Sequence, residues 1–173
     1  PREDFYLSVC RLVPNKRVDL LVRAFNKLKL PLIVIGDGVE KGYLKELAGA
    51  TVQILGFQSK EKIENLMSRC RAFVYAGIED FGIAPVEAMA SGAPVIAFGK
   101  GGVLDTVKCF NSNSNKGATG LLFPAQTVKS LVEAIEFFKE KQLWRDLNPE
   151  LIRDWSNSFS QDSFKKRFEK IIN

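Results

Sequence analysis

The sequence has 173 residues, of which 46% are hydrophobic and 26% charged, enough for one domain but few for two. This composition excludes a disordered chain, and no apolar run approaches the roughly 20 residues of a transmembrane helix. The net charge of +5 permits an anionic ligand without requiring nucleic acid. Because the chain has no histidine, a Ser-His-Asp triad, a histidine general base and a His-ligated metal are excluded within it.

Short apolar runs alternate along the chain with segments of helical period. The expected strands lie at 5–10, 31–35, 51–55, 72–76, 94–98 and 120–123. Apolar residues at i, i+3, i+4 and i+7 predict the intervening helices, at 18–28, 40–48, 60–70, 84–91, 103–107 and 128–138. Ser59 is the expected N-cap of the third helix. A helical segment covers about 143–173, and Pro149 is expected to break it.

This alternation predicts a single α/β domain over residues 1–173, a Rossmann-like parallel sheet with helices on both faces. In such sheets, ligands bind beyond the carboxyl ends of the strands. The loops in which we expect the site are therefore 11–16, 36–39, 56–59, 77–82 and 99–103.

Two glutamates flank the start of the helix at 84–91. Glu79 falls in the preceding loop and Glu87 in the helix, and both can accept hydrogen bonds from vicinal sugar hydroxyls. Between them, Gly82 lets a ligand approach the backbone, and the free N–H groups of the helix start favour a phosphate. Together these features indicate a nucleotide sugar. The alternative is that both acids are ordinary solvated residues.

Two cations follow the first strand, Arg11 directly and Lys16 in the next turn. Fixed cations at a strand's carboxyl end can clamp a diphosphate, although they can equally serve loop solubility. Gly101 and Gly102 follow the strand at 94–98 and could add an anion-binding turn. Without a DxD motif, we expect no metal, so cations and backbone amides must stabilise the leaving group.

The three cysteines have no CxxC or metal-binding spacing, which favours reduced thiols in a cytoplasmic protein. The sequence opens without Met and without a signal-peptide pattern. We therefore expect a piece of a longer protein.

Several of these motifs, in this order, resemble the C-terminal half of retaining GT-B glycosyltransferases, within the large bacterial family that includes polysaccharide mannosyltransferases. The resemblance rests on Arg11-x4-Lys16, Gly36-Asp37-Gly38, Gly56, Glu79-x7-Glu87 and Gly101-Gly102-x2-Asp105. The stretch from Glu79 to Gly92 is its most specific part. Cys10, Ala76-Gly77 and Asp105 depart from the usual residues of the family.

The resemblance implies one half of a GT-B fold that binds the donor. Glu79 would hold the hydroxyls of the donor sugar, and Glu87 would bind the ribose. Arg11 and Lys16 would take the diphosphate. The remaining binding positions would be the amides of Phe81, Gly82 and Ile83 for sugar and phosphate, and Gly56 and Phe57 beside the base.

The implied reaction is transfer of a hexose, with mannose favoured, from a nucleotide diphosphate sugar to a glycan or lipid-linked acceptor. GDP-mannose is the first expected donor and UDP-glucose the next, with no other cofactor. The acceptor would bind to an N-terminal domain missing from this chain, so we expect weak donor binding and no transfer by the chain alone. A catalytically silent binding module is the alternative. A dinucleotide-dependent oxidoreductase is disfavoured because no GxGxxG follows Cys10.

The final segment, 155–173, combines aromatic and apolar residues with a basic run. A solvated helix face is the simpler interpretation. Peripheral contact with the inner face of a membrane is the alternative.

Overall fold

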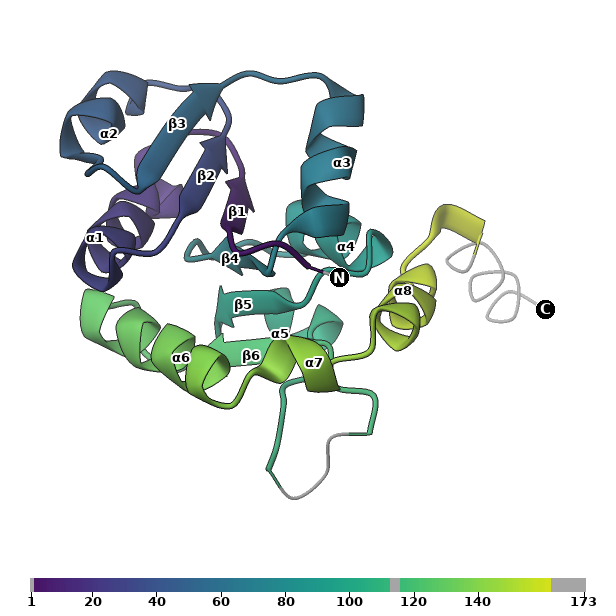
Figure 1. Ribbon diagram of the computed structural model, residues 1–173. Helices are drawn as coiled ribbons and strands as arrows, with labels where there is room; N and C mark the ends of the chain where they lie inside the picture. The colour runs from purple at the N-terminus through teal and green to yellow at the C-terminus, as the bar shows by residue number, and fades with distance from the viewer. Residues whose placement is uncertain (1, 113–115, 163–173) are drawn as a thin grey trace.

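The computed structural model describes residues 2–112 and 116–162. Six parallel strands form one sheet in the order β3-β2-β1-β4-β5-β6 (Figure 1). The strands are β1 (Tyr6–Val9), β2 (Leu32–Ile35), β3 (Val52–Gly56), β4 (Ala72–Tyr75), β5 (Val95–Phe98) and β6 (Gly120–Phe123). Each expected strand overlaps an observed one, and the predicted Rossmann-like α/β fold is confirmed.

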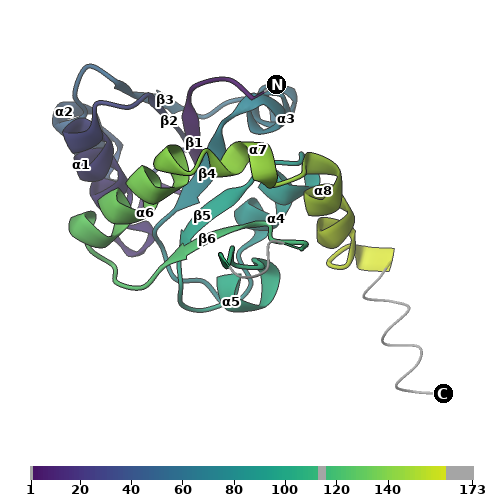
Figure 2. The same ribbon diagram turned by 60° about the horizontal axis from the view of Figure 1, so that its bottom comes forward.

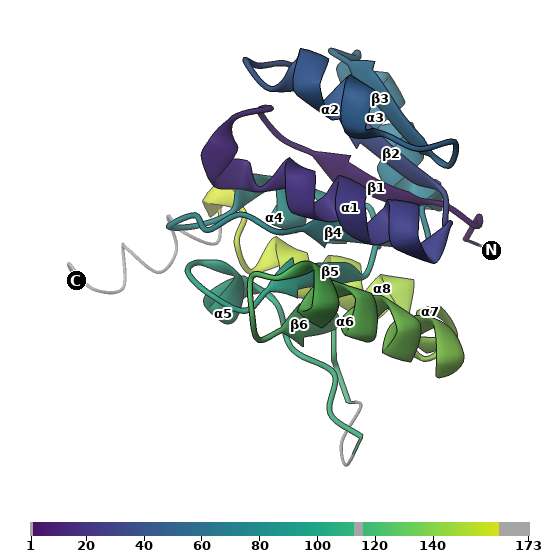
Figure 3. The same cartoon turned by 90° about the vertical axis from the view of Figure 1, so that its left-hand side faces the viewer.

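Helices cover both faces of this sheet. They are η1 (Pro14–Lys16), α1 (Val18–Leu28), α2 (Lys41–Leu47), α3 (Lys60–Arg69), α4 (Ile83–Ala90), α5 (Val103–Thr106), α6 (Val128–Glu140), α7 (Leu143–Asp146) and α8 (Pro149–Asn157). Figure 3 looks onto the face that α1 and α6 cover, where these two helices pack together. On the opposite face α3, α4 and α8 lie side by side, and α7 joins α6 to α8 (Figure 2).

The core lies between the sheet and these two helical layers. All residues of β4 and β5 are buried, as expected for central parallel strands with helices on both sides. The ring of Tyr6 packs against Phe25 of α1 and Phe138 of α6, with ring centroids 5.1 and 6.5 Å apart. The strands therefore form a rigid support for the loops that follow their carboxyl ends.

The helix starts are set by local capping. Ser59 caps α3 as expected, because its side chain accepts a hydrogen bond from the N–H of Lys62. The expected break at Pro149 is confirmed, because α7 ends at Asp146 and a new helix, α8, begins at Pro149. Asn148 caps α8 by accepting from the N–H of Glu150 at 2.8 Å, and Pro149 is the first helical residue, where its missing N–H costs no hydrogen bond.

The predicted helical segment at 143–173 is described only as far as residue 162. The basic run and the last apolar residues of that segment lie outside the described residues. No helix in the described part of the chain is both long and apolar enough to cross a bilayer. The assignment of residues 1–173 to a single domain stays a prediction.

Candidate functional site

The site lies where the strand order reverses. The chain winds outward from β1 through β2 to β3, then returns beside β1 with β4 and winds the other way. At such a switch point the loops after the two central strands separate and leave a crevice. Here those loops carry Arg11 and Lys16 after β1, and Glu79 after β4.

Lys16 and Glu79 meet across this crevice. The ammonium group of Lys16 donates to Oε1 of Glu79 and forms an ion pair with it. Only 14% of the Lys16 side chain and 28% of the Glu79 side chain are exposed. Gly77 permits the approach, because a Cβ at this position would lie 3.2 Å from Cα of Lys16 and 2.8 Å from the hydroxyl of Tyr75. The loops at 11–16 and 77–82, in which the site was expected, thus meet at this ion pair, whereas the catalytic roles of the two residues stay predictions.

The loop that carries Glu79 is held from two further strand ends. The N–H of Gly102 donates to the carbonyl of Glu79 at 2.7 Å, and the side-chain amide of Gln126 donates to the carbonyl of Ala76 at 2.8 Å. A Cβ on Gly102 would lie 2.4 Å from the carbonyl oxygen of Asp80. The Gly102 amide therefore holds this loop rather than facing an anion, which corrects the expectation for that residue. Gln126 was missed because it belongs to no motif.

The start of α4 keeps its backbone donors available. Gly82 is the N-cap residue, with a left-handed backbone (φ 78°), and no side chain caps the helix. The first N–H groups of a helix have no acceptor within it, so they can bind an anion. Phe81 and Ile83, on either side of Gly82, are 46% and 65% exposed. This helix start adjoins the Glu79 loop.

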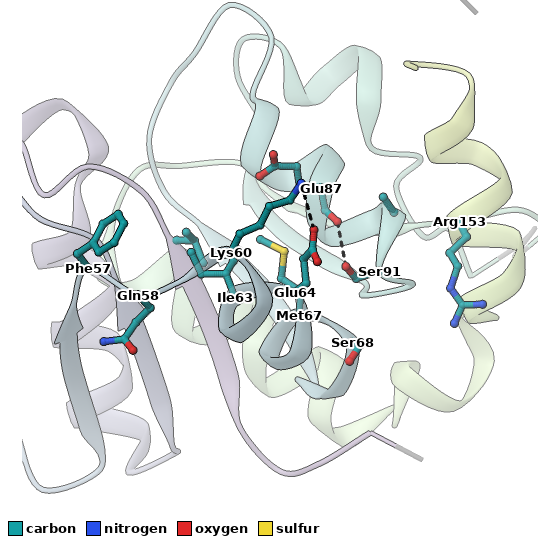
Figure 4. Close-up of a pocket in the computed structure, with 12 residues that line it drawn as sticks. Phe57, Gln58, Lys60, Ile63, Glu64, Met67, Ser68, Glu87, Ser91 and Arg153 are labelled. Atoms are coloured by element: carbon teal, nitrogen blue, oxygen red, sulfur yellow. Dashed lines mark hydrogen bonds and ion pairs between the residues drawn. The ribbon is translucent and has the colours of Figure 1, made fainter. Parts of the chain in front are cut away.

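A cavity of about 780 Å³ opens between α3 and α4, and its residues are drawn in Figure 4. The volume is in the range typical of small-molecule sites. Its aromatic and charged or amide-bearing lining residues include Phe57, Gln58, Lys60, Glu64, Glu87 and Arg153. Phe57, which follows the buried Gly56 at the end of β3, is 82% exposed. Glu87 and Phe57 therefore share one cavity.

The four charged residues that the sequence analysis assigned to the donor site are only partly brought together. Lys16 and Glu79 are in contact, and Glu87 lines the cavity beside Phe57. Arg11 is exposed at the end of β1 and makes no hydrogen bond or ion pair with the described residues. Gly101 packs against the Glu79 loop, where its Cβ would lie 2.5 Å from the Glu79 carbonyl oxygen. The structure thus contains an ion pair and a neighbouring cavity rather than a single cluster.

Cys10 lies next to Arg11 at the end of β1. Burial raises the pKa of its thiol to about 11, although the charge of Lys16 opposes the shift. The thiol is therefore neutral at physiological pH and adds no negative charge beside the two cations. Within residues 2–112 and 116–162, no three or more His, Cys, Asp or Glu residues gather in a way that could hold a metal ion.

The remaining cavity residues were not anticipated from the sequence. Lys60 and Glu64 have the i, i+4 spacing that is usual for a solvated ion pair on a helix surface. Arg153 comes from α8, far away in the sequence. Only the packing of α3, α4 and α8 brings these residues to one cavity.

Comparison with known proteins adds to this geometry. Residues 1–159 match the family described as Glycosyl transferases group 1. The alpha-1,3/1,6-mannosyltransferase ALG2 of Saccharomyces cerevisiae is 33% identical over 97% of this chain and 43% of its own length. A GDP-mannose-dependent alpha-mannosyltransferase of Corynebacterium glutamicum is 31% identical over 73% of this chain and 29% of its own length. The chain thus spans less than half the length of these relatives.

Solved structures share the fold. The structure of Anabaena Alr3699/HepE in complex with UDP and glucose superimposes with a TM-score of 0.78 at 24% identity. The superposition covers 98% of this chain and 48% of that one.

Proposed function

The chain belongs to the group 1 glycosyl transferases, and from this membership we propose that it is the donor-binding domain of a retaining glycosyltransferase. The enzyme would transfer a hexose from a nucleotide diphosphate sugar to a glycan or lipid-linked acceptor. One observation carries the proposal. A half-buried carboxylate and an ammonium group meet at the switch point of the sheet, in Glu79 and Lys16, beside the uncapped start of α4.

The charges of this pair suit the two ends of a sugar diphosphate. In the proposal Glu79 accepts hydrogen bonds from the hydroxyls of the donor sugar, since an ionised carboxylate is an acceptor only. Lys16 turns to the diphosphate, and Arg11 adds a planar fork that can bind two phosphate oxygens. The free amides at the start of α4 face the same anion. Fixed cations and amides would thus stabilise the leaving nucleotide, without a metal.

The cavity between α3 and α4 suits the nucleoside. Glu87 would accept hydrogen bonds from the ribose hydroxyls, and Phe57 would lie beside the base. Both residues line the cavity, and the large exposed surface of Phe57 is available for stacking.

For the donor we propose GDP-mannose first and UDP-glucose second. GDP-mannose is supported by the relatives named as mannosyltransferases. UDP-glucose is supported by the UDP and glucose that are bound in the Anabaena structure. The acceptor would bind to an N-terminal domain outside this chain. We further propose a cytoplasmic location, supported by three free cysteines; peripheral contact with the inner face of a membrane stays the alternative to a solvated helix face.

The proposal is tested by sugar transfer in the full-length protein that contains this chain. Glu79→Ala should reduce turnover strongly, because the donor sugar loses its carboxylate partner. Asp80→Ala removes an exposed acid from the same loop and should leave turnover near that of the unmodified enzyme. The isolated chain should bind nucleotide weakly and transfer no sugar. Donor binding without transfer by the full-length protein would favour the silent binding module instead.

A further inference from the structure

The segment between Glu79 and α4 depends on support from outside the loop. The hydrogen-bond donors proposed there for the sugar and the phosphate are backbone amides, so the backbone itself must be held in place before the ligand binds. Gly82 has no side chain and a left-handed backbone (φ 78°), and glycine is the residue with the greatest conformational freedom. The side chain of Phe81, directly before it, is therefore the nearest group through which this backbone can be held.

An aromatic contact from the end of α8 supplies this support. The ring of Phe81 lies edge-to-face against the ring of Phe159, with centroids 6.1 Å apart and planes at 68°. Phe159 follows the last turn of α8, and its N–H donates to the carbonyl of Ser156 at 3.0 Å. The indole of Trp155 packs against the Phe159 ring, with centroids 5.3 Å apart and planes at 87°. Three rings thus connect the end of α8 with the residue that precedes Gly82.

The helix α8 is itself fixed along α4. Gly92, which follows α4, lies against the first residue of α8, because a Cβ at this glycine would be 3.1 Å from Cβ of Pro149. At the other end of α8, Phe159 meets Phe81 just before the start of α4. The two helices therefore pack side by side and run antiparallel (Figure 1). A rigid neighbour of this kind can transmit its position to the loop.

A second connection runs from α8 to the same loop through α5. The indole N–H of Trp155 donates to the carbonyl of Thr106 at 2.7 Å, and the Thr106 hydroxyl donates to the carbonyl of Gly102 at 3.2 Å. The N–H of Gly102 in turn donates to the carbonyl of Glu79. The end of α8 is thus connected to the loop at Phe81 by ring contacts and at Glu79 by hydrogen bonds.

We propose that Phe159 is a positioning residue of the donor site, which holds the amides of Phe81 and Gly82 in place through the Phe81 ring. The inference rests on the proposed function and deepens it, because it adds a residue that acts on the donor only through another side chain. Phe81 is 46% exposed, so its contact with Phe159 buries no core residue. Loss of the contact should therefore be detected in donor binding.

Isothermal titration calorimetry of the full-length protein with GDP-mannose and UDP-glucose tests the inference. Phe159→Ala removes the ring, and the affinity for the donor that the unmodified protein binds should fall about two- to tenfold, the effect of losing one edge-to-face pair. Phe159→Tyr keeps the ring and should restore the affinity of the unmodified protein. A merely structural role would lower Tm without changing the affinity of the folded protein, so an unchanged affinity in Phe159→Ala would overturn the inference.

A double-mutant cycle shows whether Phe159 acts through Phe81. Phe81→Ala and Phe159→Ala break the same contact, so the double variant should bind the donor no more weakly than Phe81→Ala alone. Additive losses would overturn the inference.

Leu151→Ala is the matched control, because Leu151 lies on the same helix and is 51% exposed. Its substitution should leave donor affinity unchanged, and a loss equal to that of Phe159→Ala would count against a specific role for the Phe159 ring. Each of these negative results would leave the proposed function standing. An unmodified full-length protein that binds neither donor would overturn the proposed function as well.

Discussion

Replacing Lys16 with Met tests the ion pair at the switch point. The substitution keeps an unbranched side chain of similar length but leaves the Glu79 carboxylate without its partner. A hydrogen bond to a charged group contributes about 1.5–3 kcal/mol, whereas a fully exposed ion pair contributes about 0.2–1 kcal/mol. Because 14% and 28% of the two side chains are exposed, we expect an intermediate loss, about 1–2 kcal/mol of the free energy of unfolding. For a chain of this size, that corresponds to a decrease in Tm of about 2–8 °C.

A double-mutant cycle isolates the interaction from other effects of the substitutions. Lys16→Met, Glu79→Gln and the double variant would be unfolded in urea, and the coupling energy between the two sites should be about 1 kcal/mol or more. The pair between Lys129 and Glu133 on α6 provides a control cycle. Its atoms are 3.9 Å apart and its side chains are 85% and 62% exposed, so its coupling should not exceed about 0.5 kcal/mol. Equal coupling in the two cycles would refute the argument that burial strengthens the Lys16–Glu79 pair.

Further predictions concern Arg11, two glycines and two buried cysteines. Arg11→Ala should weaken binding of the donor diphosphate by about 2–3 kcal/mol, as measured by calorimetry, and an unchanged affinity would remove Arg11 from the site. Gly102→Ala should lower the free energy of unfolding by about 1–3 kcal/mol, because the new methyl group would lie 2.4 Å from a backbone carbonyl oxygen. Gly42→Ala lies in α2, where the new methyl group would meet no atom within 4 Å apart from its chain neighbours and the backbone of its own helix, and should instead stabilise the chain by about 0.5–1 kcal/mol. Burial raises the pKa values of Cys10 and Cys70 from 9.0 to about 11 and about 12, so the unfolded chain loses these protons first as the pH rises. Stability should therefore be unaffected by these thiols below pH 9 and fall above it, by up to about 1.4 kcal/mol per pH unit for each thiol; a flat urea-unfolding profile between pH 9 and pH 11 would contradict this.

The location of Lys16 and Glu79 at the same edge of the sheet could be predicted, because it depends on topology. Alternating strands and helices imply a parallel sheet, and in that sheet the loops after neighbouring central strands leave at the same edge. Two oppositely charged residues in those loops can then form an ion pair if the backbones of the two loops approach closely. Gly77 allows this approach. The sequence shows that Gly77 departs from the family pattern, but it does not show what Gly77 does.

The cavity could not be predicted in the same way, because it depends on how three helices pack. Arg153 reaches it from α8, and Lys60 and Glu64 reach it from α3, but the sequence contains no signal for the relative position of these helices. The contact made by Gly102 could not be predicted for a related reason. A glycine-rich turn after a strand fits an anion site and a close backbone contact equally well, and only the structure places Gly102 against the Glu79 loop.

The proposed function explains why Glu79 and Glu87 lie apart from each other. A nucleotide diphosphate sugar carries its hydroxyls in two rings with the diphosphate between them, so two acceptors in one cluster could not serve both rings. Glu79 precedes the start of α4, and Glu87 lies four residues into that helix from Ile83, a rise of about 6 Å. The uncapped amides of α4 lie between the two acids, where the diphosphate would be. Because this arrangement depends on the position of the helix start, shortening the segment between Glu79 and Glu87 would disrupt binding of the diphosphate and of both rings together.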